Sequence, residues 1–225
     1  MKVIILTEGK ANRFGGREID GGFGFELSGG AIALDFANTL DERPGGGVER
    51  LTDYNRLLQW SEQAGALNAG EVARLARAAA ADSPGAEKAV ESARVLRELV
   101  FSVVNRSVSS REPTPLQVRQ LNAWVRRAAL DRQLEARPGG LAWRAPDKMR
   151  RFDAMLPRVA ESIVSILTDE AATKRLRLCS AERCDWLFLD TTRRQNRIWC
   201  DMSVCGNRAK ARRHYHRGQE RDQPC

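Results

Sequence analysis

The residues best suited to chemistry are four cysteines in two CxxxxC pairs, Cys179 with Cys184 and Cys200 with Cys205. Thiolates are soft ligands, and four of them complete a tetrahedral shell around zinc without leaving a position open for water or substrate. The alternatives are redox-active thiols, ordinary small core residues and an iron site, for which other cysteine spacings are usual. The sequence therefore predicts a structural Zn2+ site that folds a small module and catalyses no reaction.

A strongly basic segment continues directly from the last of these cysteines. Residues 171–225 hold 13 Lys and Arg against 6 Asp and Glu, whereas the first 170 residues hold 24 against 23. Almost all of the formal net charge of +8 therefore lies on the cysteine-containing module. A neutral body with a basic module predicts a polyanionic partner, most often DNA or RNA, and a membrane surface is the weaker interpretation.

The elements that must hold the cysteines follow from the residues between and after them. Residues 185–189 and 197–199 have strand-like composition and flank the polar turn TTRRQN. We expect a knuckle, a β-hairpin between the cysteine pairs, and a basic helix that begins at Cys205 with Asn207 as its cap. Trp186, Phe188 and Trp199 would supply the apolar packing of this treble-clef-like finger, and the metal would supply most of the remaining stability.

Basic residues on this helix and on the turn are the candidates for DNA contact. A basic helix on a metal-braced platform suits the major groove, where arginine pairs with guanine edges and other cations hold phosphate. A solvated charged face is the alternative, and for the tail histidines so is a role as metal ligand or base. The candidate DNA-binding residues are Arg193, Arg194, Arg197, Asn207, Arg208, Lys210, Arg212, Arg213, His214 and Arg217.

The rest of the chain predicts a mainly α fold. Apolar residues at three-and-four spacing predict helices over 54–65, 72–79, 84–104, 118–128 and 152–167, the last kinked or begun at Pro157. The pattern predicts a short buried helix over 31–40, with a strand running into a helix as the alternative, a hairpin over 134–144, a weak strand over 23–27 and loop before it. The predicted units are a glycine-rich extension (1–22), a helical domain (23–170) and the finger (171–225), and we expect metal chelation to unfold the finger while the helical domain survives.

Within the helical domain, Asp35, Asn38 and Thr39 are polar groups on an apolar stretch. They could line an effector pocket, or cap the helix and satisfy buried backbone groups. The sequence contains no nucleophile elbow, phosphate loop or HExxH motif, and we expect no enzyme. The longest early apolar run, residues 3–6, is too short for a signal peptide or a bilayer span, so we expect a cytoplasmic protein without a membrane partner.

Two stretches of the sequence resemble a known family. CGNRAKARRH, preceded by FLDTTRRQNRIWCDMSV, resembles the CGNR zinc-finger family of bacterial proteins, and the upstream LDFANTL resembles the opening signature of the helical ABATE domain. The resemblance implies stress-induced transcriptional regulators whose finger binds DNA through zinc. By position, it places the zinc ligands on Cys179, Cys184, Cys200 and Cys205 and the family tetrad on residues 205–208.

These observations together predict a zinc-dependent DNA-binding transcriptional regulator. The helical domain would sense a small-molecule effector or form a homodimer, because a single small finger reads only a few base pairs of double-stranded DNA. An RNA-binding protein, with Tyr215 and Trp186 stacking on bases, and a zinc-finger adaptor that docks another protein are the two alternatives.

Overall fold

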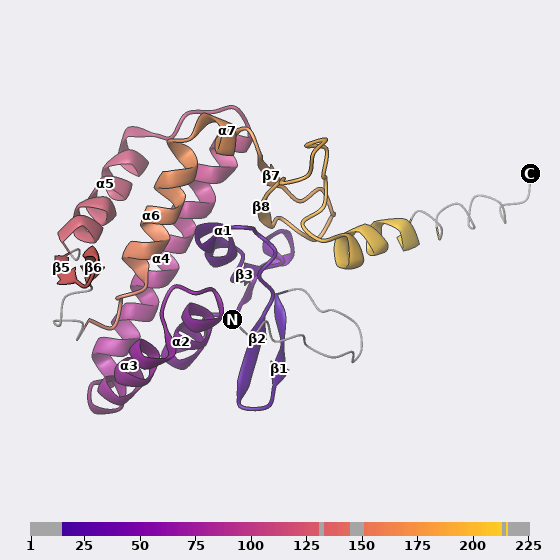
Figure 1. Ribbon diagram of the computed structural model, residues 1–225. Coiled ribbons are helices and arrows are strands. Elements are labelled where there is room, and N and C mark those ends of the chain that lie inside the picture. Colours follow the sequence, from indigo (N-terminus) through magenta and orange to yellow (C-terminus); the bar gives the residue numbers. More distant parts are fainter. Residues whose placement is uncertain (1–14, 131–132, 145–150, 213–214, 216–225) are drawn as a thin grey trace, which may run out of the picture.

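A long central helix organises the body of the protein (Figure 1). The computed structural model describes residues 15–130, 133–144, 151–212 and 215, and in it helix α4 contacts α1, α2, α3, α5 and α6. The helices are α1 (Ile32–Ala37), α2 (Tyr54–Gln63), α3 (Ala69–Ala81), α4 (Ser83–Val108), α5 (Pro115–Leu130), α6 (Leu156–Leu167) and α7 (Glu170–Thr173). The predicted mainly α fold is confirmed. Among the described residues, none of the helices combines the length and the apolar character needed to cross a bilayer.

Local capping explains where these helices begin. The Asp53 carboxylate accepts the amide three residues later at 2.9 Å and starts α2. Asn68 and Glu71 form a reciprocal capping box at the start of α3, with bonds of 3.0 and 2.7 Å. Asp82 caps α4, and Pro157 lies in the first turn of α6, where its missing amide costs nothing. The helix over 152–167 therefore begins near Pro157 and is not kinked there.

The apolar faces of α1, α2, α4 and α6 meet in one main core. Its largest fully buried side chains include Trp60, Phe36 and Ile163, and the rings of Phe36 and Trp60 lie 4.8 Å apart. The core also includes Leu176 and Leu187, which belong to the cysteine-containing region. The body and the finger therefore share buried apolar surface.

Short antiparallel hairpins complete the body. They are β1 (Gly16–Ile19) with β2 (Gly22–Phe25), β3 (Leu40–Asp41) with β4 (Val48–Glu49), and β5 (Gln133–Arg137) with β6 (Gly140–Arg144). The third is the hairpin predicted over 134–144. The prediction of loop before residue 23 was wrong, because β1 pairs with β2 through a turn in which Gly21 has φ +82°. Side-chain amides of Gln59 and Gln63 on α2 bind the backbone of β2 and hold this hairpin against the body.

The finger is built differently from the predicted hairpin. Strand β7 (Leu176–Leu178) pairs with β8 (Leu187–Leu189), so the hairpin encloses the first cysteine pair and does not lie between the two pairs. Residues 197–199, which the structure describes, form no strand; a single backbone bond of 2.9 Å joins Ser180 N to Ile198 O. A π-helical turn (Met202–Gly206) follows and continues as an α-helix to residue 212.

Candidate metal centre and nucleic-acid interface

The structure brings the four predicted ligand cysteines together at one buried point. Cys179 follows β7, Cys184 lies in the turn before β8, Cys200 precedes the π-helical turn and Cys205 lies within that turn. All four Sγ atoms lie within 4.8 Å of one another. Two of the sulfur pairs, Cys184 with Cys200 and Cys200 with Cys205, are separated by 3.7 and 3.5 Å. A tetrahedron with metal–sulfur bonds of about 2.3 Å has edges of about 3.8 Å, so this donor set fits a tetrahedral thiolate metal site.

The contacts among the four sulfurs also shift the pKa values of these thiols. Hydrogen bonds from the Cys184, Cys200 and Cys205 thiols lower the pKa of Cys179. The contact with the Cys179 sulfur raises the pKa of Cys184 and of Cys200, and burial adds to this. The sulfurs thus favour one thiolate and disfavour the others. A divalent cation is the group that would stabilise all four as thiolates.

Aromatic and apolar side chains surround the cluster as predicted. Trp186, Phe188 and Val204 are buried against the cysteines, and Trp199 packs on them while partly exposed. A Cβ atom on Gly206 would lie 2.5 Å from the Met202 sulfur and 3.3 Å from the Trp199 ring. The close packing of these side chains explains a glycine directly after the last cysteine.

Arg197 is committed to the interior of the finger. Its guanidinium donates to the Trp199 carbonyl oxygen at 2.8 Å and to that of Cys200, and lies 4.7 Å from the centre of the Phe188 ring. Its backbone amide donates to the buried Asp190 carboxylate at 2.8 Å. We predicted that the Arg197 guanidinium contacts phosphate. In the structure, the same guanidinium already binds two carbonyl oxygens of the finger.

The basic helix begins before Cys205, earlier in the chain than predicted. Asp201 is its N-cap and accepts the Val204 amide at 2.9 Å. Asn207, predicted as the cap, instead lies in helical conformation with φ −68°, and its side-chain amide donates to the Ser203 carbonyl oxygen. The prediction that Asn207 caps the helix was wrong, because the Asp201 carboxylate lies three residues before the Val204 amide and caps the helix there. Sequence reasoning missed Asp201, although its spacing from Val204 is a capping signal.

The predicted DNA-contact residues other than Arg197 fall into three groups. Arg208, Lys210 and Arg212 are exposed on the helix beside Asn207, and Arg212 forms an ion pair with Glu182. Arg193 and Arg194 are exposed on the turn after β8, where the buried Asp190 carboxylate accepts the Thr192 amide and hydroxyl. Arg213, His214 and Arg217 lie outside the described residues. The structure therefore presents two exposed basic segments on the finger.

The candidate effector residues are buried and bonded within the protein. Asp35 accepts the Gly29 amide at 2.7 Å, and burial raises the pKa of its carboxyl to about 6. Thr39 donates to the Phe36 carbonyl oxygen at 2.7 Å. Asn38 pairs with the backbone of Leu187 in the finger. These contacts match the interpretation that the three residues satisfy buried backbone groups, and an effector pocket here stays a prediction.

Comparison with known families finds two matches along the chain. Residues 30–170 match the ABATE family, described as "Putative stress-induced transcription regulator", and residues 175–218 match the CGNR zinc finger. The comparison with curated proteins finds no match. The family matches span the helical body and the four-cysteine cluster, and the chain belongs to the ABATE family, with a CGNR zinc finger as its C-terminal part.

Proposed function

We propose that this protein is a cytoplasmic, zinc-dependent transcription regulator that binds double-stranded DNA through its finger and is not an enzyme. The observation that carries the proposal is the position of the four-cysteine cluster at the start of the basic helix. Cys205 lies in the first turn, so metal bound there would fix the direction in which Arg208 and Lys210 leave the finger. A helix fixed in this way can enter the major groove with its cations outward.

The exposed turn at Arg193 and Arg194 would add phosphate contacts beside the helix. Phosphate contacts position a protein on DNA without reading sequence, whereas the helix would read base edges. The helical body would supply effector sensing or a homodimer contact, since one helix of this length covers few base pairs. Each phosphate contact should change the logarithm of the affinity by about −0.9 per tenfold rise in salt.

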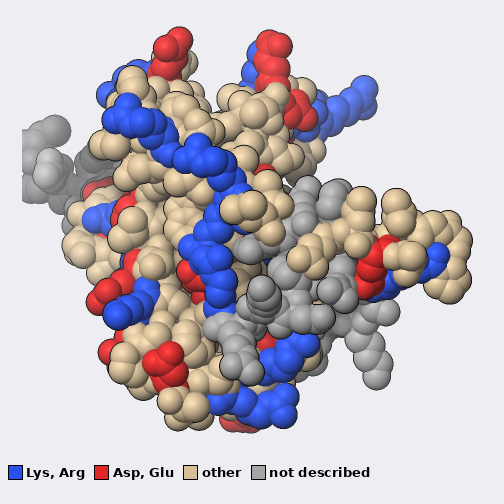
Figure 2. Space-filling view, turned by 90° about the vertical axis from the view of Figure 1, so that its left-hand side faces the viewer, with Lys and Arg blue, Asp and Glu red and all other residues tan. Residues whose placement is uncertain are grey.

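Charge reversal at two matched places tests the proposal. The double variant Arg208→Glu and Lys210→Glu changes the helix. The variant Arg119→Glu and Arg126→Glu makes the same change in charge on α5, which lies on the side of the body away from the finger (Figure 1). Figure 2 shows that this face also carries a row of basic side chains, with acidic ones beside it, so its charge is a fair control.

Binding of each zinc-loaded variant to duplex DNA would be measured by fluorescence anisotropy over a range of salt. We expect the helix variant to lose binding and the α5 variant to keep most of it. Equal losses of DNA affinity in both variants would show that binding is a nonspecific attraction that depends on net charge alone. Tighter binding of the unchanged protein to single-stranded or structured RNA would favour the RNA-binding alternative, and retained partner capture without nucleic-acid affinity would favour a protein adaptor.

A further inference from the structure

The segment that follows α1 forms hydrogen bonds and ion pairs with the finger beside a candidate metal ligand. Residues 38–43, which we call the clasp, pair with residues 183–187, which include Cys184. Asn38 and the Leu187 backbone exchange two hydrogen bonds of 2.9 Å, and the Asp41 carboxylate accepts the Trp186 indole N–H at 2.9 Å. The remaining ion pairs are Glu42 with Arg183 at 2.9 Å and Arg43 with Asp185 at 3.7 Å.

The two hydrogen-bonded pairs lie inside the protein, and the ion pairs lie nearer the surface. Asn38, Asp41, Trp186 and Leu187 are at most 4% exposed. Loss of one partner there would leave a buried polar group without a hydrogen bond, which is strongly unfavourable. The Arg183 side chain is 71% exposed, so its ion pair contributes little.

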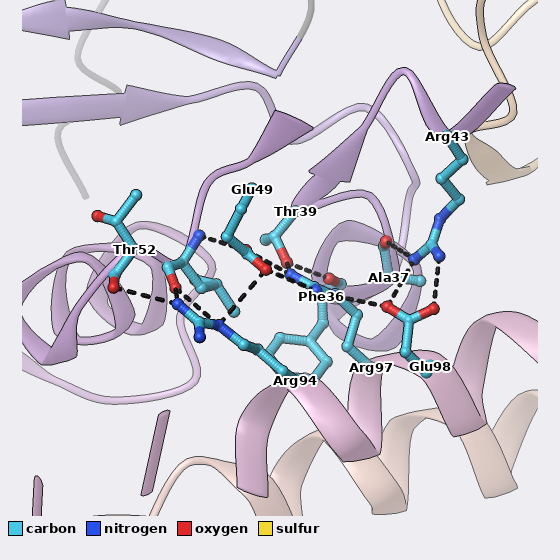
Figure 3. A network of polar contacts seen from close by, with 10 residues as sticks. Phe36, Ala37, Thr39, Arg43, Glu49, Thr52, Arg94, Arg97 and Glu98 are labelled. Atoms are coloured by element: carbon cyan, nitrogen blue, oxygen red, sulfur yellow. Dashed lines mark hydrogen bonds and ion pairs between the residues drawn. The ribbon is translucent and has the colours of Figure 1, made fainter. Parts of the chain in front are cut away.

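The clasp is itself fixed to the central helix α4 (Figure 3). Arg43 binds Glu98 at 2.5 Å and the Ala37 carbonyl oxygen at 3.3 Å. The buried Arg97 donates two hydrogen bonds to Glu49 on β4, the partner strand of β3, which begins at Leu40 within the clasp. Arg97 and Glu98, two consecutive residues of α4, therefore bind strand β4 and the turn between β3 and β4, so the clasp is fixed to the body.

The clasp reaches the metal ligands through the backbone of Trp186. The Trp186 carbonyl oxygen accepts the Cys179 amide at 2.9 Å, while its indole is held by Asp41. Cys184 is two residues before Trp186 and donates its own amide to the Ala181 carbonyl oxygen at 2.9 Å. A shift of Trp186 would therefore move both ligands of the first cysteine pair.

We propose that Asn38, Asp41 and Trp186 are positioning residues of the metal centre. The helical body uses the clasp to hold the first cysteine pair in its ligating arrangement, so metal affinity and the stability of the body are coupled. Such coupling is reciprocal: metal binding stabilises the body to the same extent that the folded body favours metal binding. The proposal does not depend on what the basic helix binds.

Zinc transfer from the full-length protein to a chromophoric chelator tests this coupling. The variant Asn38→Ala removes two hydrogen bonds of the clasp, and Trp186→Phe removes one. The control is Leu75→Ala, a buried residue of helix α3, and this helix lies far from the finger in Figure 1. Tm is measured for every variant, so that zinc release can be compared at equal stability.

We expect Asn38→Ala and Trp186→Phe to release zinc about 10-fold faster, the usual scale for groups that orient metal ligands. Leu75→Ala should lower Tm without changing the release rate measured below that Tm. Unchanged release in both clasp variants would overturn the proposal. So would equal acceleration in Leu75→Ala, because zinc retention would then follow general stability. If Asn38→Ala does not fold, the test depends on Trp186→Phe, which removes the indole N–H but keeps a buried aromatic ring.

Discussion

The indole Nε1 of Trp186 donates a hydrogen bond of 2.9 Å to Oδ1 of Asp41, and both side chains are almost completely buried. Trp186 lies between the two metal-binding cysteine pairs, whereas Asp41 lies on strand β3 of the helical body. Arg50 forms an ion pair with the second oxygen of the same carboxylate at 3.0 Å. The finger is therefore joined to the body by more than the connecting chain, because it also forms a hydrogen bond with a buried side chain of the body.

This connection changes what metal removal should do. Leu176 and Leu187 of the finger lie in the main core, so unfolding of the finger would expose apolar surface of the body. We expect chelation to leave most of the helical circular dichroism at 25 °C but to lower the Tm of the body by at least about 5 °C, since 1 kcal/mol corresponds to about 2–4 °C in a domain of this size.

Thermal unfolding with and without chelator, followed at 222 nm, measures this shift. The Cys200→Ser and Cys205→Ser double variant should show the low Tm without chelator and no further change when chelator is added. An unchanged Tm in the chelated protein would restore the simpler expectation that the body is independent of the finger.

Substitutions at Arg197 distinguish a structural role of its side chain from a phosphate-binding role. Its guanidinium binds two carbonyl oxygens near Cys200, a geometry that the ammonium of lysine does not reproduce. Arg197→Lys should therefore release zinc about 10-fold faster, nearly as fast as Arg197→Ala. Arg194→Lys, on the exposed turn, is the matched control. If Arg197→Lys retained zinc normally and only Arg197→Ala lost DNA binding, charge on phosphate would be the role of this residue.

Asp201 is expected to set the start of the basic helix. Asp201→Ala removes the acceptor for the Val204 amide and should destabilise the finger by about 1 kcal/mol. Asp201→Asn keeps a capping oxygen and should lose less. Limited proteolysis of the zinc-loaded variants would detect the difference, and equal cleavage of Asp201→Ala and the unchanged protein would assign the helix start to the metal alone.

Asp35 should make stability depend on pH. Burial raises the pKa of Asp35 to about 6 from its ordinary value of 3.8, so the folded state keeps its proton where the unfolded state has lost it. Stability is then greatest below the unfolded pKa, falls as pH rises towards 6 and stays lower above it. Asp35→Asn carries no charge and should gain stability over the unchanged protein as pH rises, reaching roughly 3 kcal/mol above pH 7.

Urea unfolding of both proteins between pH 4 and 8 measures this difference. The asparagine keeps an oxygen for the Gly29 amide, so the hydrogen bond of Asp35 is not the variable. Asp20→Asn, in the exposed turn between β1 and β2, is the matched control substitution. A constant difference between Asp35→Asn and the unchanged protein would show that the pKa of Asp35 is the same in the folded and unfolded states.

The features that the sequence predicted well depend on local information. Three-and-four spacing located the long helices, such as the one introduced by Pro84, and the CxxxxC spacing picked out sulfurs that the structure brings together. Strand pairing was predicted less well, because β8 could pair with any strand of suitable length and pairs with β7, which precedes the first cysteine. The roles of Asn38 and Asp41 depend on residues about 150 positions away, and no local pattern indicates such partners.

The main proposal is that the protein reads DNA sequence only with zinc bound, and selection from a pool of randomised duplexes measures this property. The zinc-loaded full-length protein would be compared at physiological salt with the Cys200→Ser and Cys205→Ser double variant. We predict that one motif is enriched by the intact protein alone, and a palindromic motif would in addition indicate a homodimer. Enrichment of the same motif by both proteins, or no enrichment with binding that vanishes as salt rises, would contradict the claim.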